Sequence, residues 1–491
     1  MASIESINPS TGESQLEAQE ESSSSDLSRA VESAKTLAQP WRWTASADRA
    51  LVLEAIADAL DGAASELAQL ADTETALGAD RLVGEIGRTT FQLRFFADAL
   101  KSSQLGSREV DDAVAGAPPA GRPRLVRNLI GIGPVAVFGA GNFPFAFGEL
   151  GGDTASALAA GCPVVVKEHP GHPVLAQTVV KLAQDAIENA GHDRHLVQGV
   201  RGFEAGRELV QHPGITAVGF TGSQVAGRAL FDLASQRPEP IPFFGELGSM
   251  NPVFVTRAAL AERKELIASE AAAAISIGRG QFCTKPAVMF VPDDEEFVAL
   301  LASGLSDMEA GPLLSPSSKD RFDANVSALK AVDGVEELVS TSRGGAPYDV
   351  SPGLLVTSLD KFLAQAPALL EECFGPIALV IQVSNDEDFA SVVPFLEGCL
   401  VSTIHAEPTS DQELVSALVE TLSEISGRIV LNGWPTGLAV APAQNHGGPY
   451  PASTAPLHTS VGLHAIERFL RPVVIQNATH EDWPSLGHLV Q

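Results

Sequence analysis

The sequence predicts an α/β protein with two lobes, each built around a doubly wound parallel sheet. Short apolar runs alternate with Gly/Pro turns and Ala-rich helical stretches through most of the chain, and this alternation is typical of parallel strands joined by crossover helices. The 491 residues suffice for two or three structural units, and 45% hydrophobic residues suffice for a large core. Charged residues at 19%, with 44 Gly and 32 Pro, argue against a coiled coil or a disordered chain.

The first hundred residues are predicted to be mostly helical. From residue 26 to about residue 100, apolar residues recur every three or four positions, as in LVLEAIADAL, and Asp26 is expected to cap the first helix. The segment 106–132 is rich in Pro and Gly and carries Arg122, Arg124 and Arg127. We expect it to be an extended excursion and not a core element.

Two sets of alternating elements follow, and each set predicts one lobe. The first set comprises predicted strands 135–138, 164–166 and 215–220 with helices 150–160, 173–189 and 224–234. The second set comprises strands 253–255, 287–291, 378–382, 400–405 and 429–432 with helices 263–277, 294–303 and 385–396. The apolar run FLRPVVIQ near the end of the chain is expected to form a strand that could pair with a neighbouring chain.

The charge balance restricts the partners. The chain has 32 Lys and Arg against 61 Asp and Glu, a net charge of −29. Such a chain repels nucleic acid phosphates and anionic lipid, so we expect neither nucleic acid nor a membrane as a partner. An anionic substrate or cofactor must be held by local Arg or Lys groups.

The four cysteines predict neither a disulfide framework nor a metal site, because no CxxC or Cys/His ligand spacing is present. The polar, acidic start MASIESINPSTGES does not resemble a signal peptide, and no apolar run approaches the ~20 residues that span a bilayer. A cytoplasmic protein with free thiols is expected.

One of the cysteines is a candidate nucleophile. Cys283 lies in GQFCTKP between Gly280 and Pro286, which favour a turn with close backbone approach, and a thiolate on such a loop is a strong nucleophile. Taken alone it could equally be a buried structural cysteine, as we expect for Cys162, Cys373 and Cys399 in or beside apolar runs. The nearby Lys285 and Arg279 would either lower the pKa of the Cys283 thiol or point outward.

Two further residues could take part in the same chemistry. Glu246 lies in FFGELGSMNP, where partial desolvation would raise the pKa of its carboxyl and suit it to general-base catalysis; by spacing alone it could also be a turn or cap residue. Asn142, in VAVFGAGNFPF, could donate its amide to an oxyanion, a role worth about 10²–10³ in rate, or could be an ordinary loop residue.

A phosphate site is predicted at Gly222 and Ser223. The segment GFTGS follows a predicted strand and precedes the helix QVAGRALFDLA, so backbone N–H groups at the helix start can receive a pyrophosphate. The GAG at 139–141 is not a dinucleotide fingerprint, since it lacks the third glycine and the following helix start.

Together these segments resemble a known family. The motifs GNFP, FTGS, FGELGS, GQFCT and EECFGP occur in this order, and the resemblance to the aldehyde dehydrogenase superfamily runs from about residue 5 to about residue 475. VVVKEHPGHP, PEPIPFFGELG, NGWPTG and HGGPYPAS further resemble a branch of NADP-preferring enzymes. That branch oxidises 2,5-dioxopentanoate (α-ketoglutarate semialdehyde) or long-chain fatty aldehydes.

The resemblance implies oxidation of an aldehyde to a carboxylate through a thioester. Cys283 would be the nucleophile, Glu246 the base that activates water, and Asn142 with the Cys283 N–H the oxyanion hole. For the cofactor, Lys167 would hold the adenosine ribose or its 2′-phosphate, Glu372 and Phe374 the nicotinamide ribose, and Gly222 and Ser223 the pyrophosphate. A CoA-acylating variant is disfavoured, because Glu246 promotes attack by water.

The choice of cofactor depends on the residues after Lys167. Many NAD-using relatives place a glutamate three residues after the lysine, where this chain has Pro170. With His169 and Arg201 nearby, this favours NADP, although the adjacent Glu168 leaves NAD possible.

The substrate depends on the side chains of the predicted tunnel. Aligned on LRFFA, Arg88 falls at a tunnel-lining position, with Gln92 on the same helical face and Phe143 and Phe147 as an apolar wall. If Arg88 enters the tunnel, a semialdehyde acid such as 2,5-dioxopentanoate is favoured. If Arg88 is an exposed ion-pair arginine and the phenylalanines leave an apolar tube, a medium or long aliphatic aldehyde is the favoured substrate. A non-catalytic nucleotide-binding scaffold is the third alternative.

The resemblance also implies a division of the chain. We expect a dinucleotide-binding domain over 1–114 and 134–245 and a catalytic domain over 246–441. Residues 115–133 and 460–491 would form a small β oligomerisation arm, because an exposed apolar strand edge otherwise invites aggregation. A homodimer or homotetramer is expected.

Overall fold

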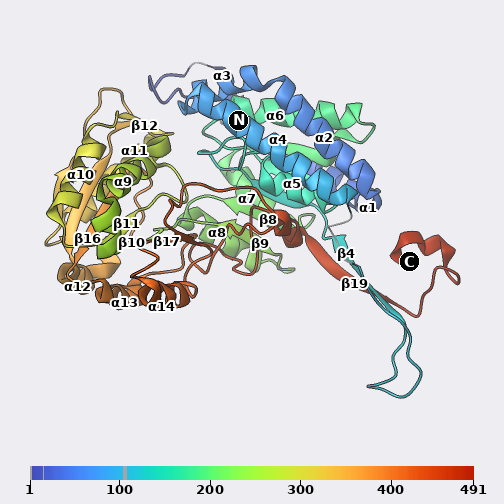
Figure 1. Cartoon of the computed structure of the whole chain (residues 1–491). Coiled ribbons are helices and arrows are strands. Elements are labelled where there is room, and N and C mark those ends of the chain that lie inside the picture. The colour runs from blue at the N-terminus through green and yellow to red at the C-terminus, as the bar shows by residue number, and fades with distance from the viewer. Residues whose placement is uncertain (1–2, 15, 103–107, 491) are drawn as a thin grey trace.

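The computed structural model describes residues 3–14, 16–102 and 108–490. Figure 1 shows two α/β lobes side by side and a narrow β arm that projects from the one containing the N-terminus. In the part of the chain that is described, no helix has both the length and the apolarity to cross a bilayer.

Four helices make up the N-terminal part of the chain, as predicted. They are α1 (Ser24–Trp43), α2 (Ser46–Gly62), α3 (Ala64–Thr75) and α4 (Ala79–Lys101), preceded by the short strands β1 (Ser3–Ile4) and β2 (Gln19–Glu20). Asp26 was expected to cap the first helix, but the N-cap is Ser23. Asp26 is the third helical residue and closes a capping box with Ser23. The predicted N-cap therefore lies three residues beyond the observed one, which is in a run of serines.

The first lobe contains a five-stranded parallel sheet in the order β7-β6-β5-β8-β9. The strands are β5 (Val135–Phe138), β6 (Val164–Lys167), β7 (Val197–Val200), β8 (Ala217–Thr221) and β9 (Phe243–Glu246), joined by α5 (Gly152–Ala159), α6 (Pro173–Asn189), α7 (Phe203–Gln211) and α8 (Gln224–Ser235). Alternate residues of β5 contribute to different hydrophobic clusters, Val135 and Val137 to one and Ala136 and Phe138 to the other. The sheet is thus buried on both faces, as predicted for a doubly wound sheet.

The strand order of this sheet reverses between β5 and β8. From β5 the chain moves outward through β6 and β7, then returns to the other side of β5 for β8 and β9. Ligands of open α/β sheets bind in the crevice at the carboxyl ends of the strands flanking such a reversal. The loops that leave β5 and β8 here carry Asn142 and Gly222.

The second lobe contains a seven-stranded sheet in the order β13-β15-β16-β11-β10-β17-β18, parallel except for β13. The strands are β10 (Val253–Val255), β11 (Val288–Pro292), β13 (Glu336–Val339), β15 (Gly353–Ser358), β16 (Ile377–Val383), β17 (Ser402–His405) and β18 (Ile429–Leu431). Its helices are α9 (Arg257–Ser276), α10 (Glu295–Ser306), α11 (Pro316–Lys330), α12 (Leu359–Leu369), α13 (Phe389–Val392) and α14 (Gln412–Leu422), with the two-stranded pair β12 (Gly311–Pro312) and β14 (Asp349–Val350) beside them. The helix predicted over 385–396 is wrong as a single element: Pro394 opens a separate 3₁₀ turn after α13.

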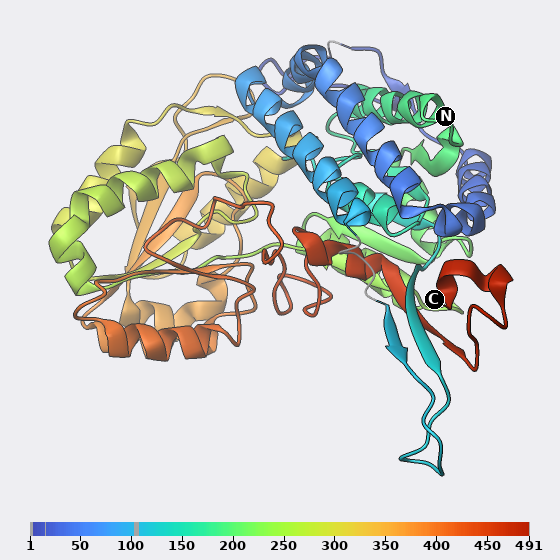
Figure 2. The same cartoon turned by 45° about the vertical axis from the view of Figure 1, so that its right-hand side comes forward.

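The arm is a three-stranded antiparallel sheet, which Figure 2 shows extending away from both lobes. It contains β3 (Glu109–Asp111), β4 (Leu125–Gly131) and β19 (Leu470–Gln476). The terminal strand was expected to pair with a neighbouring chain, but one edge of β19 pairs with β4 of the same chain along its whole length. Its other edge has no strand partner among the described residues.

One buried carboxylate joins the helical layer to the first sheet. Glu74, near the end of α3, accepts hydrogen bonds from the Ser6 hydroxyl at 2.6 Å and from the backbone N–H groups of Val174 and Leu175 at 3.1 and 2.8 Å. The last two are free N–H groups of the first turn of α6. Glu74 is fully buried, so the helix depends on this side chain and not on water.

We predict that Glu74→Ala destabilises the protein by about 2–3 kcal/mol, because it leaves two buried backbone donors without acceptors. The exposed Glu66 on the same helix is the matched control, and Glu66→Ala should change stability by less than about 0.5 kcal/mol. Thermal unfolding of the two variants compares them. Equal unfolding temperatures would contradict the prediction.

Candidate active site

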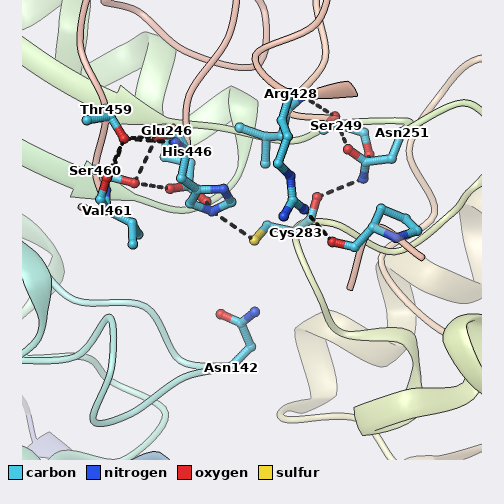
Figure 3. Close-up of polar contacts among 12 residues, drawn as sticks. Asn142, Glu246, Ser249, Asn251, Cys283, Arg428, His446, Thr459, Ser460 and Val461 are labelled. Atoms are coloured by element: carbon cyan, nitrogen blue, oxygen red, sulfur yellow. Dashed lines mark hydrogen bonds and ion pairs between the residues drawn. The ribbon is translucent and has the colours of Figure 1, made fainter. Parts of the chain in front are cut away.

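The candidate site lies where the two lobes meet. Glu246 ends β9 of the first sheet, Asn142 follows β5 of the same sheet, and Cys283 follows the 3₁₀ turn Ile277–Gly280 that ends α9 of the second lobe. Figure 3 shows the three side chains, which the sequence places up to 141 positions apart, gathered around the Cys283 sulfur. As predicted, the other three cysteines are buried, whereas Cys283 is partly exposed.

A histidine completes this cluster. His446 Nε2 lies 3.5 Å from Cys283 Sγ and 2.9 Å from Glu246 Oε1, so the imidazole joins the thiol to the carboxylate. Both His446 and Glu246 are at least 95% buried, with exposed fractions of 2% and 4%. The sequence analysis did not predict His446. Its motif HGGPYPAS was recognised, but no fixed spacing relates this histidine to a cysteine 163 residues earlier.

The loop at 459–460 holds both partners of the thiol. The Thr459 hydroxyl accepts the backbone N–H of His446 at 2.8 Å, and the Ser460 hydroxyl donates to Glu246 Oε2 at 2.8 Å. Ser460 thereby leaves Oε1 of the carboxylate facing the imidazole (Figure 3).

The pKa of the Glu246 carboxyl is lowered, which corrects the expectation that desolvation would raise it. Burial by itself does raise this pKa, but the charge and hydrogen bond of His446 and the hydrogen bonds from Ser460 and Cys283 outweigh the burial. Glu246 is therefore ionised at neutral pH and is ready to accept a proton.

The pKa of the Cys283 thiol is raised well above its ordinary value, which corrects the expectation that nearby cations would lower it. The causes are burial and the negative charges of Glu246 and Glu372, only partly opposed by Arg88. Lys285 neither points outward nor faces the sulfur: its ammonium is buried and donates to the Cys373 and Ile377 carbonyls at 3.1 and 2.7 Å.

The oxyanion amide is tied to the nucleophile loop. Asn142 Nδ2 donates one hydrogen bond to the Gln281 carbonyl at 2.9 Å, two residues before Cys283, and its second N–H remains available to a substrate oxygen. From α4, Arg81 donates to the Asn142 carbonyl at 2.7 Å, and its guanidinium lies 5.0 Å and 5.2 Å from the ring centres of Phe143 and Phe282. Arg81 thus contacts both catalytic loops.

Two close approaches fix the backbone at Cys283. Gly280 has a φ of +64°, and a Cβ there would lie 2.3 Å from the carbonyl carbon of Gly375, so only glycine fits. Asn251 Nδ2 donates to the Cys283 carbonyl at 2.8 Å. Gly280 was expected to let the backbone approach a substrate closely, and the structure instead shows a close approach to the Gly375 backbone, which brings the loop of Glu372 and Phe374 beside the loop of Cys283.

The predicted phosphate residues lie at the reversal of the first sheet. Ser223 is the N-cap of α8 and its hydroxyl accepts the Ala226 N–H at 3.4 Å, while the Gly222 N–H donates to the Glu246 carbonyl. On the other side of the crevice, the Glu372 carboxyl lies within 2.2 Å of the position that a Cβ on Gly248 would take. Burial raises the pKa of Glu372 to about 6, although Lys285 opposes this.

The residues around Lys167 differ from the expected cationic cluster. Burial lowers the pKa of Lys167 to about 8, in spite of the carboxylates of Glu149 and Glu168. His169 stacks on His172 at 5.0 Å, and burial with the neighbouring charges lowers its pKa well below the usual value, so it carries no positive charge at neutral pH. Arg201 forms a 2.9 Å ion pair with the buried Glu168. Of the three predicted cations, only Lys167 has a positive charge without a direct ion pair among the described residues.

Arg88 is not a surface ion-pair arginine. Its guanidinium lies 5.3 Å from the ring centre of Phe147, which in turn lies 5.9 Å from the His446 ring. Phe143 packs between Phe147 and Phe282 with ring centres at 5.7 and 4.9 Å. Gln92 is buried against the start of α5, where its amide fills the place of a Cβ on Gly152.

Comparisons with known proteins show the family of the chain. The chain matches the aldehyde dehydrogenase family model over residues 1–472. It is 39% identical to alpha-ketoglutaric semialdehyde dehydrogenase 2 of Azospirillum brasilense and to alpha-ketoglutaric semialdehyde dehydrogenase of Acinetobacter baylyi, in each case over 92% of this chain and 87% of the relative.

The fold agrees with solved structures as well. A putative aldehyde dehydrogenase from Burkholderia cenocepacia superposes with a TM-score of 0.81 at 23% identity, covering 97% of this chain and 94% of that one. A 3,6-anhydro-L-galactose dehydrogenase superposes with a TM-score of 0.82 at 23% identity, covering 97% and 96%. The chain belongs to the aldehyde dehydrogenase family and is an NAD(P)-dependent aldehyde dehydrogenase.

Proposed function

We propose that this enzyme oxidises 2,5-dioxopentanoate to 2-oxoglutarate, with NADP as its preferred cofactor. The observation that supports this substrate is the state of Arg88. Its Nε and Nη2 atoms are buried and have no hydrogen-bond partner among the described residues. These two nitrogens form one edge of the guanidinium, the edge that binds a carboxylate through two parallel hydrogen bonds.

The position of Arg88 suits such a substrate. The guanidinium is close enough to Cys283 and Glu246 for its charge to act on both. An aldehyde carbon at the Cys283 sulfur therefore leaves the carboxylate at the far end of a short chain near Arg88. The names of the two relatives at 39% identity agree with this assignment.

The residues support the following mechanism. The Cys283 thiol, whose pKa is raised, gives up its proton to the His446–Glu246 pair as the sulfur attacks the aldehyde. Asn142 and the Cys283 N–H hold the oxygen of the resulting tetrahedral adduct. A bound nicotinamide would supply the hydride acceptor, and loss of hydride from the adduct would leave a thioester on Cys283. The pair then releases the thiol proton to solvent, and ionised Glu246 takes a proton from a water molecule whose oxygen attacks the thioester carbon. The Cys283 sulfur leaves and regains that proton, and the carboxylic acid formed ionises.

The chain's residues fit a bound dinucleotide. The crevice at the strand reversal presents the α8 N-terminus with Ser223 for the pyrophosphate and Lys167 at the end of β6. Glu372 and Phe374 approach from the second lobe. The preference for NADP rests on Lys167 and on Pro170, since Arg201 is engaged by Glu168 and His169 is neutral. NAD is the alternative.

The lobes divide these tasks in the proposed enzyme. Residues 1–114 and 134–245 would bind the dinucleotide, and residues 246–441 would carry the nucleophile. The arm, from 115–133 and 460–491, would join copies into a dimer or tetramer through the unpaired edge of β19.

A second substrate class has an observation in its favour. Phe143, Phe147 and Phe282 form a continuous aromatic wall beside the site, which suits a medium or long aliphatic aldehyde. Hexanal and succinate semialdehyde are therefore the comparison substrates. Under the proposal, kcat/KM is highest for 2,5-dioxopentanoate. A Cys283→Ser variant with unchanged turnover would instead show that any activity measured does not arise at Cys283, as expected if the chain is a non-catalytic nucleotide-binding scaffold.

We predict that Arg88→Met lowers kcat/KM for 2,5-dioxopentanoate by about 100-fold, the worth of a charge-assisted pair of hydrogen bonds, and changes that for hexanal by less than about threefold. Arg94→Met is the matched control. This arginine lies on the same helix, pairs on the surface with Asp58 and Asp61, and should leave both values unchanged. Equal losses on both substrates in Arg88→Met would refute the assignment of the carboxylate site.

We predict that Arg81→Met lowers kcat about 10–100-fold with little change in KM, because the oxyanion amide loses its support. The double variant with Asn142→Ala distinguishes positioning from general destabilisation. If Arg81 acts through Asn142, the double variant should be about as slow as Asn142→Ala alone. If the losses in kcat of the two single variants add in the double variant, Arg81 does not act through Asn142.

We predict that NADP binding weakens above pH 8. The pKa of Lys167 in the free enzyme is about 8, so the ammonium that faces the 2′-phosphate is present below pH 8 and is lost as the pH rises through that value. The Kd for NADP should rise about tenfold per pH unit above the pKa, while that for NAD rises less. Equilibrium titration from pH 6.5 to 9.5 measures both. A Lys167→Met variant that keeps the same pH dependence would contradict this origin.

A further inference from the structure

The catalytic cluster has a second chemical property, which follows from the identity of its atoms. Cys283 Sγ, His446 Nε2 and a Glu246 carboxylate oxygen all lie within 4.8 Å of one another. Thiolate, imidazole and carboxylate are the three side-chain ligand types that proteins use for zinc. No disulfide or second cysteine competes for this sulfur among the described residues.

The distances suit a tetrahedral ion. With Zn–S of about 2.3 Å and Zn–N or Zn–O of about 2.0–2.1 Å, ligand atoms lie roughly 3.3–3.6 Å apart. The Sγ–Nε2 separation is 3.5 Å and already matches. The Nε2–Oε1 separation is 2.9 Å, so the carboxylate must withdraw by about half an ångström to meet the same geometry.

The ligands are oriented from behind, as in a built metal site. Ser460 donates to Oε2 of Glu246 and leaves Oε1 facing His446, while Thr459 holds the backbone of His446. A hydrogen bond to a ligating carboxylate, such as the one from Ser460, orients metal ligands in proteins. Because Cys283 is partly exposed whereas the other two ligands are buried, the fourth position would face the substrate side and take water.

We propose that Cys283, Glu246 and His446 form a zinc-binding site, and that one Zn²⁺ ion bound there inhibits the enzyme reversibly. Binding forms a Zn–S bond and releases the thiol proton to solvent, with no change of oxidation state. The Cys283 thiolate and the Glu246 carboxylate, which repel each other in the free enzyme, would then both bind the dication. The ion occupies the nucleophile and the base together, so inhibition does not depend on which aldehyde is the substrate.

Binding is measured directly, without turnover. Wild-type enzyme stripped with EDTA should take up one Zn²⁺ per chain in equilibrium dialysis. Co²⁺ in its place should give a thiolate-to-metal charge-transfer absorption. Zinc should also protect Cys283 from alkylation by iodoacetamide, and EDTA should restore both alkylation and activity.

Variants separate this site from a lone thiol. Cys283→Ser should lose the absorption and the bound zinc, and His446→Asn should bind zinc at least about tenfold more weakly than wild type. Cys399→Ser is the control, because this cysteine is buried among Ser402 and Ser426 of the second lobe, and it should behave as wild type. Cofactor binding by each variant confirms that it is folded.

Two outcomes would overturn the proposal. If Cys283→Ser keeps its zinc and shows the absorption, the ion is bound elsewhere. If His446→Asn binds zinc as tightly as the wild type, the sulfur acts alone and the three residues do not form a site.

Discussion

The hydrogen bond from Asn142 to the Gln281 carbonyl joins the two lobes at the position where the reaction takes place. Asn142 belongs to the first sheet and Gln281 to the loop of the second lobe that carries Cys283. An oxyanion hole requires its donors within a few tenths of an ångström of the reacting carbon's oxygen. The site therefore exists only when the lobes are in register. Arg81, which contacts the Asn142 carbonyl and the Phe282 ring, maintains that register from α4, while the close approach of Gly280 to Gly375 fixes the loop of Cys283 within the second lobe.

The need to hold the loops of the site in place also explains where the buried charged residues lie. The chain has a net charge of −29, yet buried cations and anions are placed individually around the site. Glu85 in α4 accepts the backbone N–H groups of Phe145 and Ala146 at 2.8 and 2.9 Å, and so holds the oxyanion loop from the same helix as Arg81 and Arg88. One face of α4 thus supports the loop that carries Asn142. The same face carries Arg88, whose Nε and Nη2 atoms have no hydrogen-bond partner among the described residues. Under the proposed function, this arrangement would make α4 a link between catalysis and substrate choice.

His446 changes how the nucleophile is understood. With the pKa of the Cys283 thiol raised by burial and by two carboxylates, the thiolate is scarce until a partner accepts the proton. In the proposed mechanism the His446–Glu246 pair is that partner, with His446 Nε2 lying 3.5 Å from the sulfur and 2.9 Å from the carboxylate. The arrangement resembles the cysteine–histidine pairs of other thiol enzymes, in which a base activates the nucleophile on demand. It also explains why the cluster has the composition of a zinc site.

The sequence alone determined the fold class and the three residues that surround the sulfur. Alternating strands and helices predict two parallel sheets because hydrophobic periodicity is local. Cys283, Glu246 and Asn142 each lie in a short Gly-containing motif, and the order of these motifs along the chain identified them. The sequence pattern did not predict the edge strands β7 and β9, which are only four residues long. Short strands depend on their partners in the sheet more than on their own composition.

Only the tertiary structure decided the state of those residues. The lowered pKa of Glu246, the pairing of Arg201 with Glu168 and the place of His446 all depend on contacts between residues 33 to 214 positions apart. Charge and burial are properties of what surrounds a side chain, and the surroundings are assembled by folding. For that reason the sequence predicts which side chains lie at the Cys283 sulfur, whereas their protonation and their hydrogen-bond partners depend on the folded chain.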